Sequence, residues 1–397
     1  MTLLADPLLT GIVLLAALAW LWLLALHGGF WGGFWRDGER LAPVQPPARP
    51  GVQPGARPSV VAVVPARDEA EVVARSVGSL LAQHYDGPFR VVLVDDGSSD
   101  GTAEIAAAQA GAAARLTVLA GAPRPEGWAG KLWAVDQGVR SCDSDWLLLT
   151  DADIAHDPAH LAALLAKAES SGAEMVSEMV ALNCESFAER ALVPAFVYFF
   201  AMLYPFRWVN DPARRTAAAA GGTVLIRRSA LERIGGIAAI RTALIDDVTL
   251  ARAVKPGAVR AGSGIWLGHS RLARSIRPYP HFADIWRMVA RSAYVQLRRS
   301  PWLLAGALAG MAWLYLLPPA AALFAAGAAR WLGLAAWLMM AATFLPTLRR
   351  FRLCPLWGLA LPAIAAFYMA ATFGSALDHH RGRGVVWKSR AYPGAGA

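Results

Sequence analysis

The stretch FRVVLVDDGSSDGT, residues 89–102, decides the fold class of this chain. Its first half is rich in valine, as is typical of a parallel strand buried on both faces, and it runs straight into an acidic, glycine-containing turn. The stretch SVVAVVP at 59–65 has the same character, and residues 69–83 between the two carry apolar side chains at helical spacing. The order strand, helix, strand predicts a parallel sheet with right-handed crossovers.

The same alternation continues downstream. We predict a helix over 102–114, a strand over 116–120 and a further strand at WLLLT, 146–150, which the triplet Asp-Ala-Asp follows. These elements together predict an α/β domain with a Rossmann-like order of strands and helices.

Carboxylates stand at the C-terminal ends of two predicted strands. Asp95 and Asp96 follow one strand, and Asp151 and Asp153 follow the other. Ligands of open α/β sheets bind at this edge, so we expect the four carboxylates to line one cleft. Carboxylates that lie so close together repel one another unless a cation or the hydrogen-bond donors of a ligand offset their charge. The pattern therefore predicts a divalent metal ion and a hydroxyl-rich ligand.

Uncharged windows long enough to cross a ~30 Å hydrocarbon layer lie on both sides of this domain. One lies near the N-terminus, and the others cover 301–329, 331–348 and 353–377. A cleaved signal peptide is the alternative for the first window, but its apolar core is long and no basic region precedes it. The predicted organisation is a membrane anchor at 7–27, a linker at 36–57, a domain at 58–300, three membrane helices over 301–377 and a basic tail at 378–397.

The charged residues indicate how the protein is oriented in the membrane and which partners it binds. Arginines flank the apolar windows on the side of the large domain, which the positive-inside rule places in the cytoplasm; the basic tail does not follow this rule. The net charge is +9, but only four of the 38 cations are lysines and no arginine-rich helix stands out. Anionic lipid and a phosphorylated substrate are therefore the expected partners, and nucleic acid is not. The spacing of Cys142, Cys184 and Cys354 indicates reduced, structural cysteines.

The motifs resemble, in order and spacing, those of family 2 glycosyltransferases with the GT-A fold. The resemblance covers 59–299 and is carried by VVPARDEAEVVARSVGSLLAQ, VVLVDDGSSDGT, DAD, AGGTVLIRRSALERIGG and DDVTLA. Within that family, PEGWAGKLWA, the apolar stretch 194–212 and the layout of anchor, domain and three spans are most similar to the hopanoid-biosynthesis-associated enzymes of bacteria. Ceramide glucosyltransferases are a more distant resemblance.

The resemblance implies a nucleotide-diphosphate sugar as donor. It places Asp96 against the nucleoside, with Pro65, Arg67 and Glu69 on the same wall, and Asp95 beside it offers a second carboxylate to base and ribose. The family usually has asparagine where this chain has an aspartate after Arg67, so that contact differs. An acidic turn that merely closes a strand is the plain alternative for DDGSSDG.

Asp151 and Asp153 are the predicted metal ligands. They stand at the end of an apolar strand, and we expect strand pleating to point both side chains to the same side, where they offer two carboxylates to one Mg²⁺ or Mn²⁺. Such an ion would stabilise the departing diphosphate as a Lewis acid.

Two further motifs have a predicted role in transfer. Lys131 lies in the glycine-rich segment GWAGK, where an ammonium could reach phosphate; a solvated loop lysine is the alternative. Asp247 takes the place of the family's general base toward the acceptor hydroxyl. Its neighbour Asp246 raises its basicity, although as a lone pair the two would more often cap a helix.

The acceptor side is less regular. The family's Gln-x-x-Arg-Trp signature is absent, with Trp286, Arg287, Arg291 and Gln296 as imperfect counterparts, which argues against a processive polysaccharide synthase. The uncharged, aromatic stretch 191–206 is short for a span, and we interpret it as an interfacial helix whose aromatic face enters the leaflet. A buried core helix is the alternative.

The sequence thus predicts a multi-pass protein of the bacterial inner (plasma) membrane with a cytoplasmic catalytic domain. Its predicted activity is inverting transfer of one hexose from a nucleotide sugar, expected to be a UDP-sugar, to a membrane lipid acceptor such as a hopanoid. A polyprenyl-phosphate sugar transferase and a catalytically idle membrane scaffold are the alternatives.

Overall fold

The computed structural model forms two compact units, which we describe separately. The sheet unit comprises Asp37–Asn183 and Trp208–Pro278, and the helical unit comprises Met1–Arg36, Cys184–Arg207 and Tyr279–Ala397. The structure describes residues 7–35, 39–43, 57–111, 115–260, 263–381, 386–387 and 390–391. Most of the predicted linker and much of the predicted basic tail lie outside these ranges.

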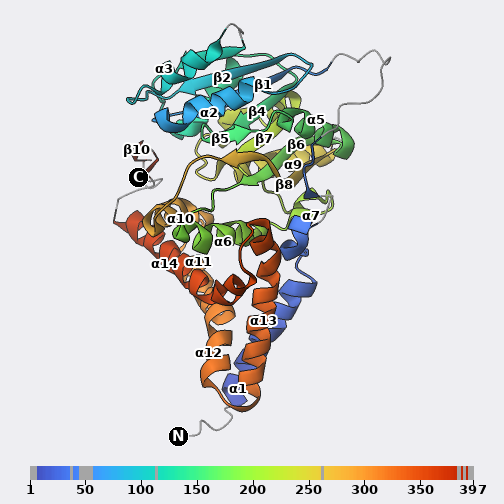
Figure 1. The fold of residues 1–397 in the computed structure, drawn as a ribbon, viewed down its shortest axis with the longest axis vertical. Coiled ribbons are helices and arrows are strands. Elements are labelled where there is room, and N and C mark those ends of the chain that lie inside the picture. Colours follow the sequence, from blue (N-terminus) through green and yellow to red (C-terminus); the bar gives the residue numbers. More distant parts are fainter. Residues whose placement is uncertain are drawn as a thin grey trace. The chain divides into compact units, whose positions relative to one another are not determined.

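The described residues of the sheet unit form one mixed eight-stranded sheet with the spatial order β3-β2-β1-β4-β7-β6-β8-β5 (Figure 1). Its strands are β1 (Val60–Ala66), β2 (Phe89–Asp95), β3 (Leu116–Ala120), β4 (Trp146–Thr150), β5 (Ile154–His156), β6 (Ala173–Ala181), β7 (Thr223–Arg227) and β8 (Gly264–Ser275).

The strands predicted from valine-rich runs pair in parallel. β1 pairs in parallel with both β2 and β4, and β2 with β3, as the sequence predicts. Strand β7 runs antiparallel to β4 and to β6 and so changes the direction of the sheet beyond β4. The carboxyl ends of β1, β2 and β4 therefore open on one edge, where the acidic turns lie.

Helices cover the sheet. They are α2 (Ala70–Leu81), α3 (Thr102–Ala107) with the 3-10 turn η3 (Ala108–Ala110), α4 (Gly130–Arg140), α5 (His160–Ser171), α8 (Arg228–Arg233), η4 (Ile237–Ile240) and α9 (Asp246–Arg260); α7 (Phe206–Asn210) joins the units. The helix predicted over 102–114 is shorter, since its α-helical part ends at Ala107, and 112–114 lie outside the described residues.

Close packing fixes α4 on the sheet. A Cβ atom at Gly138 would lie 2.5 Å from Val63 Cγ1 and 3.1 Å from Val94 Cγ2, so only glycine lets the helix approach β1 and β2 this closely. Val63 and Val94 are fully buried. This contact sets the position of the N-terminus of α4, where Lys131 lies.

Four helices of the helical unit are long and apolar enough to cross a membrane, among the residues that the structure describes. The corresponding elements are α1 (Pro7–Ala25), α11 (Pro301–Met311) with the π-helical turn η5 (Ala312–Leu316) and α12 (Leu317–Phe324), α13 (Gly327–Arg350), and η6 (Pro355–Ala360) with α14 (Leu361–His380). Also in this unit are η1 (Phe30–Trp35), α6 (Phe187–Leu203), α10 (Phe282–Gln296) and the short pair β9 (Val386–Trp387) and β10 (Arg390–Ala391).

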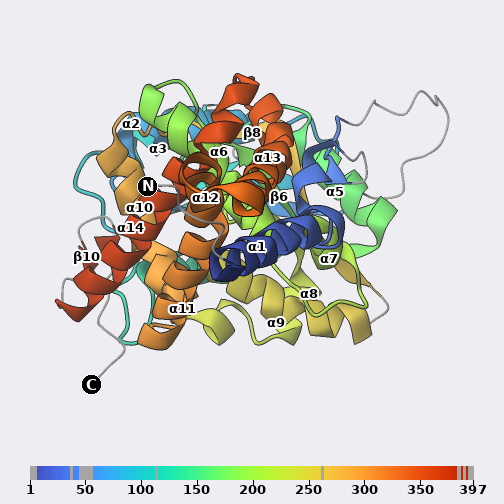
Figure 2. The ribbon, with the colours of Figure 1, turned by 90° about the horizontal axis from the view of Figure 1, so that it is seen from below.

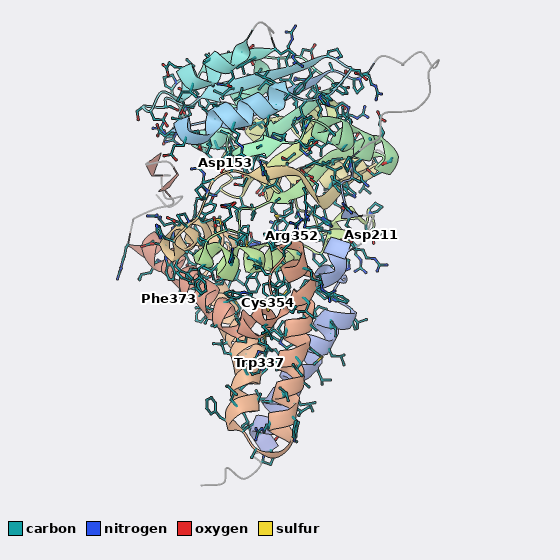
Figure 3. All side chains as sticks on the ribbon, in the orientation of Figure 1. Asp153, Asp211, Trp337, Arg352, Cys354 and Phe373 are labelled. Carbon is teal, nitrogen blue, oxygen red and sulfur yellow. The ribbon has the colours of Figure 1, made fainter. Side chains whose placement is uncertain are left out.

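Helices α1, α12 and α13 lie side by side (Figures 1 and 2). The second span ends at Phe324 rather than at residue 329, because the chain turns at Ala325 and α13 has already begun at Gly327. Large apolar side chains such as Leu338 of α13 and Phe373 of α14 point outward, as expected of lipid-facing surfaces (Figure 3 labels Phe373). Cys142, Cys184 and Cys354 are all free.

The aromatic helix α6 begins before the predicted residue 191. Ser186 accepts a hydrogen bond from the Glu189 backbone N–H, and the Glu189 carboxylate accepts one from the Ser186 N–H; this capping box starts the helix at Phe187.

The structure favours the alternative of a core helix for part of the aromatic face of α6, because the rings of Tyr198 and Phe199 pack against other helices of the helical unit. Tyr198 is 1% exposed and hydrogen-bonded to Thr343 at 2.8 Å, and its ring contacts Phe344. The ring of Phe199 contacts those of Tyr315 and Tyr368.

Replacing Phe199 and Phe200 with serine is therefore expected to lower the melting temperature of the full chain in detergent. Removing a phenylalanine side chain from a core costs about 3–5 kcal/mol of folding free energy. The cost is smaller where the ring is only partly buried. A thermal melt measures the effect, with Leu203→Ser as control because Leu203 of the same helix is 56% exposed. Equal melting temperatures for the double variant and the control would restore the lipid-facing interpretation.

Candidate active site

A lysine at the start of α4 joins two carboxylates from distant parts of the chain. Lys131 Nζ lies 2.8 Å from Asp151 Oδ1 and 2.9 Å from Asp246 Oδ2. Burial alone would lower the pKa of Lys131, but the two carboxylates outweigh it and raise the pKa above its ordinary value. The lysine is therefore a permanent cation at the centre of this cluster.

The three elements that carry these residues meet around one cavity. It is lined by polar side chains from the end of β4 and the starts of α4 and α9, and by apolar side chains beneath them: Pro65, Lys131, Leu132, Val135, Leu149, Thr150, Asp151, Gly221, Val224, Ile237, Ile240, Asp246, Asp247 and Leu250. The structure thus brings four predicted site residues, Pro65, Lys131, Asp151 and Asp247, to one place.

The local structure differs from two sequence-based expectations. Lys131 lies in the first turn of α4 and not in a loop, since Gly130 is already helical. Strand β4 ends at Thr150, so Asp151 and Asp153 lie on a turn and their common direction cannot follow from strand pleating. In this turn the Ile154 N–H donates to the Asp151 carbonyl oxygen at 3.3 Å.

Asp247 has the environment of a weak acid. Burial, together with the neighbouring charge of Asp246, raises its pKa to about 7, although the backbone N–H groups of Val248 and Gly221 bond to it. A Cβ atom at Gly221 would lie 3.2 Å from Asp247 Oδ2, so glycine leaves room for the carboxylate against the backbone. A carboxylate with a pKa near neutrality is suited to accept a proton.

Asp153 points to a different cation from that of Asp151. Arg277, just beyond the end of β8, donates from Nε to Asp153 Oδ2 at 2.9 Å and also pairs with Glu69. Asp153 follows β4 in the sheet unit (Figure 3). The arginine thus ties the acidic turn after β4 to the start of α2.

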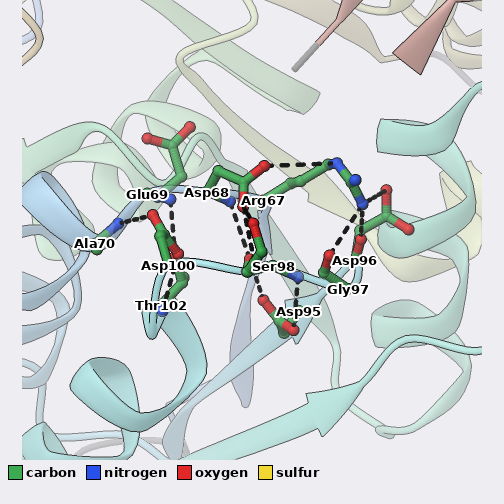
Figure 4. Close-up of polar contacts among 11 residues, drawn as sticks. Arg67, Asp68, Glu69, Ala70, Asp95, Asp96, Gly97, Ser98, Asp100 and Thr102 are labelled. Carbon is green, nitrogen blue, oxygen red and sulfur yellow. Dashed lines mark hydrogen bonds and ion pairs between the residues drawn. The ribbon is translucent and has the colours of Figure 1, made fainter. Parts of the chain in front are cut away.

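The turns after β1 and β2 form a separate polar network (Figure 4). Arg67 donates to the carbonyl oxygens of Asp96 and Gly97, and its Nη1 lies 3.8 Å from Asp96 Oδ2. Asp95 accepts hydrogen bonds from the backbone and hydroxyl of Ser98, so it stabilises its own turn.

The predicted cleft with four carboxylates is therefore only partly present. Arg67 and Asp96 lie together, as do Glu69 and Asp153 through Arg277, but neither Asp95 nor Asp96 lines the cavity around Lys131.

Sequence reasoning gave too small a role to Asp246 and missed Arg277 and Gly221. The pair Asp246–Asp247 was a visible signal for the first, whereas nothing in the sequence around Arg277 indicates its partners.

The donor set around Asp151 and Asp153 fits a hard divalent cation. Mg²⁺ is normally held by only one or two carboxylates, with substrate phosphates and water as its other ligands. The described residues contain no group of three metal-binding side chains. Asp151 and Asp153 would hold the ion, and each now pairs with a cation of the chain, Asp151 with Lys131 and Asp153 with Arg277.

Residues 61–235 match the family model described as Glycosyl transferase family 2. The chain therefore carries a glycosyltransferase domain of this family and is an enzyme of that class, as predicted. No curated protein matches the chain.

Solved structures support the fold. The chain is similar to the mannosyltransferase PcManGT from Pyrobaculum calidifontis, solved with GDP-Man and Mn²⁺, at 19% identity and a TM-score of 0.52 over 93% of this chain and 99% of that one. It also matches the mannosyl-3-phosphoglycerate synthase from Rubrobacter xylanophilus at 19% identity, over 61% of this chain and 75% of that one, with a TM-score of 0.37. The similarity to PcManGT agrees with the predicted GT-A-like fold of the sheet unit.

Proposed function

We propose that this chain, whose residues 61–235 form a family 2 glycosyltransferase domain, transfers a single hexose from a nucleotide-diphosphate sugar to a membrane lipid. The observation that carries the proposal is that this domain and four helices long and apolar enough to cross a membrane belong to one polypeptide. Such helices would hold the enzyme in the membrane, where a lipid acceptor is also located.

The donor is expected to bind at the acidic edge of the sheet. Asp96, with Pro65, Arg67 and Glu69 on the same wall, is proposed to contact the nucleoside, which we expect to be uridine. Lys131 would turn its ammonium from Asp151 and Asp246 toward the diphosphate. A Mg²⁺ or Mn²⁺ ion on Asp151 and Asp153 would supply charge to stabilise the leaving diphosphate.

Asp247 is proposed as the general base. Its carboxylate takes the proton of the acceptor hydroxyl while that oxygen attacks the anomeric carbon and the bond to the diphosphate breaks. Direct displacement with inversion is therefore the expected course.

The pKa of Asp247 predicts opposite pH trends for activity and stability. Its ordinary value is 3.8 and its value in the fold is about 7, so the stability conferred by the buried neutral form is fully present below about pH 4 and is lost as pH rises from there through about 7. The base form becomes available as pH rises through about 7, so kcat/KM is expected to rise toward a plateau above that pH. Rate profiles and thermal melts across this range test the assignment, and the loss of both trends in Asp247→Asn confirms it. If kcat/KM of that variant still rose with pH as in wild type, the base would be another group.

The acceptor is proposed to be a hopanoid or a related polycyclic or sphingoid lipid. Helix α10, which replaces the signature of processive synthases, supports transfer of one sugar. Within the helical unit its Trp286 packs on Gly374 and Phe367, and its Arg287 pairs with Asp284, so these side chains serve packing and local charge. The proposed location is the bacterial inner membrane with the transferase domain in the cytoplasm.

Lipid mass spectrometry tests the acceptor. Cells that express the wild-type chain should contain a glycolipid that is one hexose heavier than its precursor. Cells that express Asp247→Asn at equal level should contain only the precursor. A hexosylated polyprenyl phosphate in place of a neutral glycolipid would favour the polyprenyl-phosphate transferase instead.

A further inference from the structure

A chain of buried polar side chains runs from the end of β4 into the interior of the sheet unit. Thr150 Oγ1 lies 3.2 Å from His156 Nε2, and His156 Nδ1 lies 2.9 Å from His160 Nδ1. His160 Nε2 in turn lies 2.7 Å from Glu178 Oε1. Thr150 is 2% exposed, His156 5%, and His160 and Glu178 are fully buried.

The donor and the acceptor of each contact among these four side chains can be assigned by starting from Thr150. The Thr150 hydroxyl donates its only hydrogen to the carbonyl oxygen of Gly222 at 2.8 Å, so its oxygen must accept from His156 Nε2–H. Burial holds the pKa of His156 well below its ordinary value, so this ring is neutral and carries one N–H. Its Nδ1 is therefore bare and accepts from His160 Nδ1–H.

This direction leaves His160 Nε2 facing the Glu178 carboxyl group. At 2.7 Å, a bare ring nitrogen and a bare carboxylate oxygen would repel each other in a site without water-exposed surface. A proton between the two atoms would remove this repulsion. Neither Glu178 oxygen nor His160 Nε2 forms a hydrogen bond of regular geometry with the described residues, so the 2.7 Å contact is the polar contact on which the carboxyl group depends.

The other end of the chain reaches the candidate active site. The Gly222 carbonyl oxygen that accepts from Thr150 also accepts from the Asp151 backbone N–H at 3.4 Å. Gly222 follows Gly221, whose backbone N–H bonds to Asp247. Thr150 thus fixes the turn that carries Asp151 beside the turn that contacts Asp247.

We propose that Glu178, His160 and His156 are positioning residues for sugar transfer. The proton between Glu178 and His160 sets the direction of the chain, and this direction commits the Thr150 hydroxyl to Gly222. The inference rests on the proposed function, which gives Asp151 and Asp247 their roles.

Two substitutions of Glu178 separate direction from packing. Glu178→Gln can donate an amide N–H to His160 Nε2 and keeps the direction of the chain, with no other described hydrogen bond lost. Glu178→Leu has a similar volume but supplies no proton. The histidines then have no fixed tautomers, and Thr150 is free to turn its hydroxyl from Gly222 to His156.

The experiment measures kcat, donor KM, nucleotide binding by calorimetry and melting temperature for the full chain. Glu178→Gln should remain within about twofold of wild type, whereas Glu178→Leu and Thr150→Val should each lower kcat about tenfold or more, as loss of one positioning hydrogen bond predicts. The double variant Thr150→Val/Glu178→Leu should be no slower than the slower single one, because both changes break the same chain. NMR of the histidine nitrogens should show His156 as the neutral Nε2–H tautomer in wild type and in Glu178→Gln.

Several results would overturn the inference. One is a kcat of Glu178→Gln as low as that of Glu178→Leu, and another is additive effects in the double variant. A third is a lowered melting temperature of Glu178→Leu with normal kcat. If Glu178→Leu does not fold, a normal kcat of Thr150→Val would overturn the inference instead. In these cases, transfer of hexose to lipid by the wild-type chain would leave the proposed function standing, whereas its absence would refute the proposed function itself.

Discussion

Asp247→Asn is expected to lower turnover by ~10²–10⁴-fold, the usual contribution of general-base catalysis. The amide keeps the volume of the side chain and can still accept a hydrogen bond from the Val248 or Gly221 backbone, so the fold and the donor site should persist. Single-turnover rates with bound donor measure the loss, and calorimetry with the nucleotide measures donor affinity, which should be nearly unchanged.

Asp145→Asn is the matched control for this variant. Asp145 stands before β4, at its far end, where its carboxylate accepts hydrogen bonds from the backbone and hydroxyl of Ser59 at 2.7 Å. Its loss removes the same charge and a similar set of hydrogen bonds outside the cavity, so turnover should stay near wild type. If Asp247→Asn weakened donor binding while bound donor still reacted, Asp247 would be a nucleotide-binding or structural residue.

Asp153→Asn is expected to abolish metal-dependent transfer while the protein stays folded. The change removes one ligand charge and little volume, and Arg277 keeps its pairing with Glu69. Activity measured across a Mn²⁺ titration should show no rise in the variant, whereas wild type should saturate.

Glu174→Gln serves as the control for Asp153→Asn. Glu174 pairs with Arg233 in the same unit but outside the cavity, so the control breaks a comparable ion pair. Its metal response should match that of wild type. Normal turnover of Asp153→Asn over the whole titration would refute the assignment of Asp151 and Asp153 as metal ligands.

The parallel part of the fold was predictable because its signal is local. Valine-rich runs such as VVAVV and VVLV are typical of buried strands at that length, and the intervening 3.6-residue periodicity gave α2 to within two residues at each end. The antiparallel strand β7 was not predictable in this way, since its pairing with β4 joins segments far apart in the sequence. The same limit explains α6, whose aromatic rings have the composition of an interfacial helix but find partners on α13 and α14.

For the candidate site, too, the local signals were predictable and the contacts between distant segments were not. Which residue types matter followed from the motifs, so Lys131, Asp151 and Asp247 were identified before their geometry was known. Their contacts were not, because Asp246 looks like a helix cap in sequence and only the meeting of α4 and α9 makes it a partner of Lys131. Glycine before Lys131 suggested a loop, whereas the backbone is already helical there.

Label transfer from nucleotide sugar to lipid tests the central claim most directly. The purified full chain in vesicles of bacterial lipid, given Mn²⁺ and a set of sugar-labelled UDP and GDP donors, should move label from one donor into the organic phase as a single-hexose lipid. Asp247→Asn should leave that phase unlabelled. Label that remains in water as free sugar or polymer with every donor, for the wild-type chain, would contradict the account.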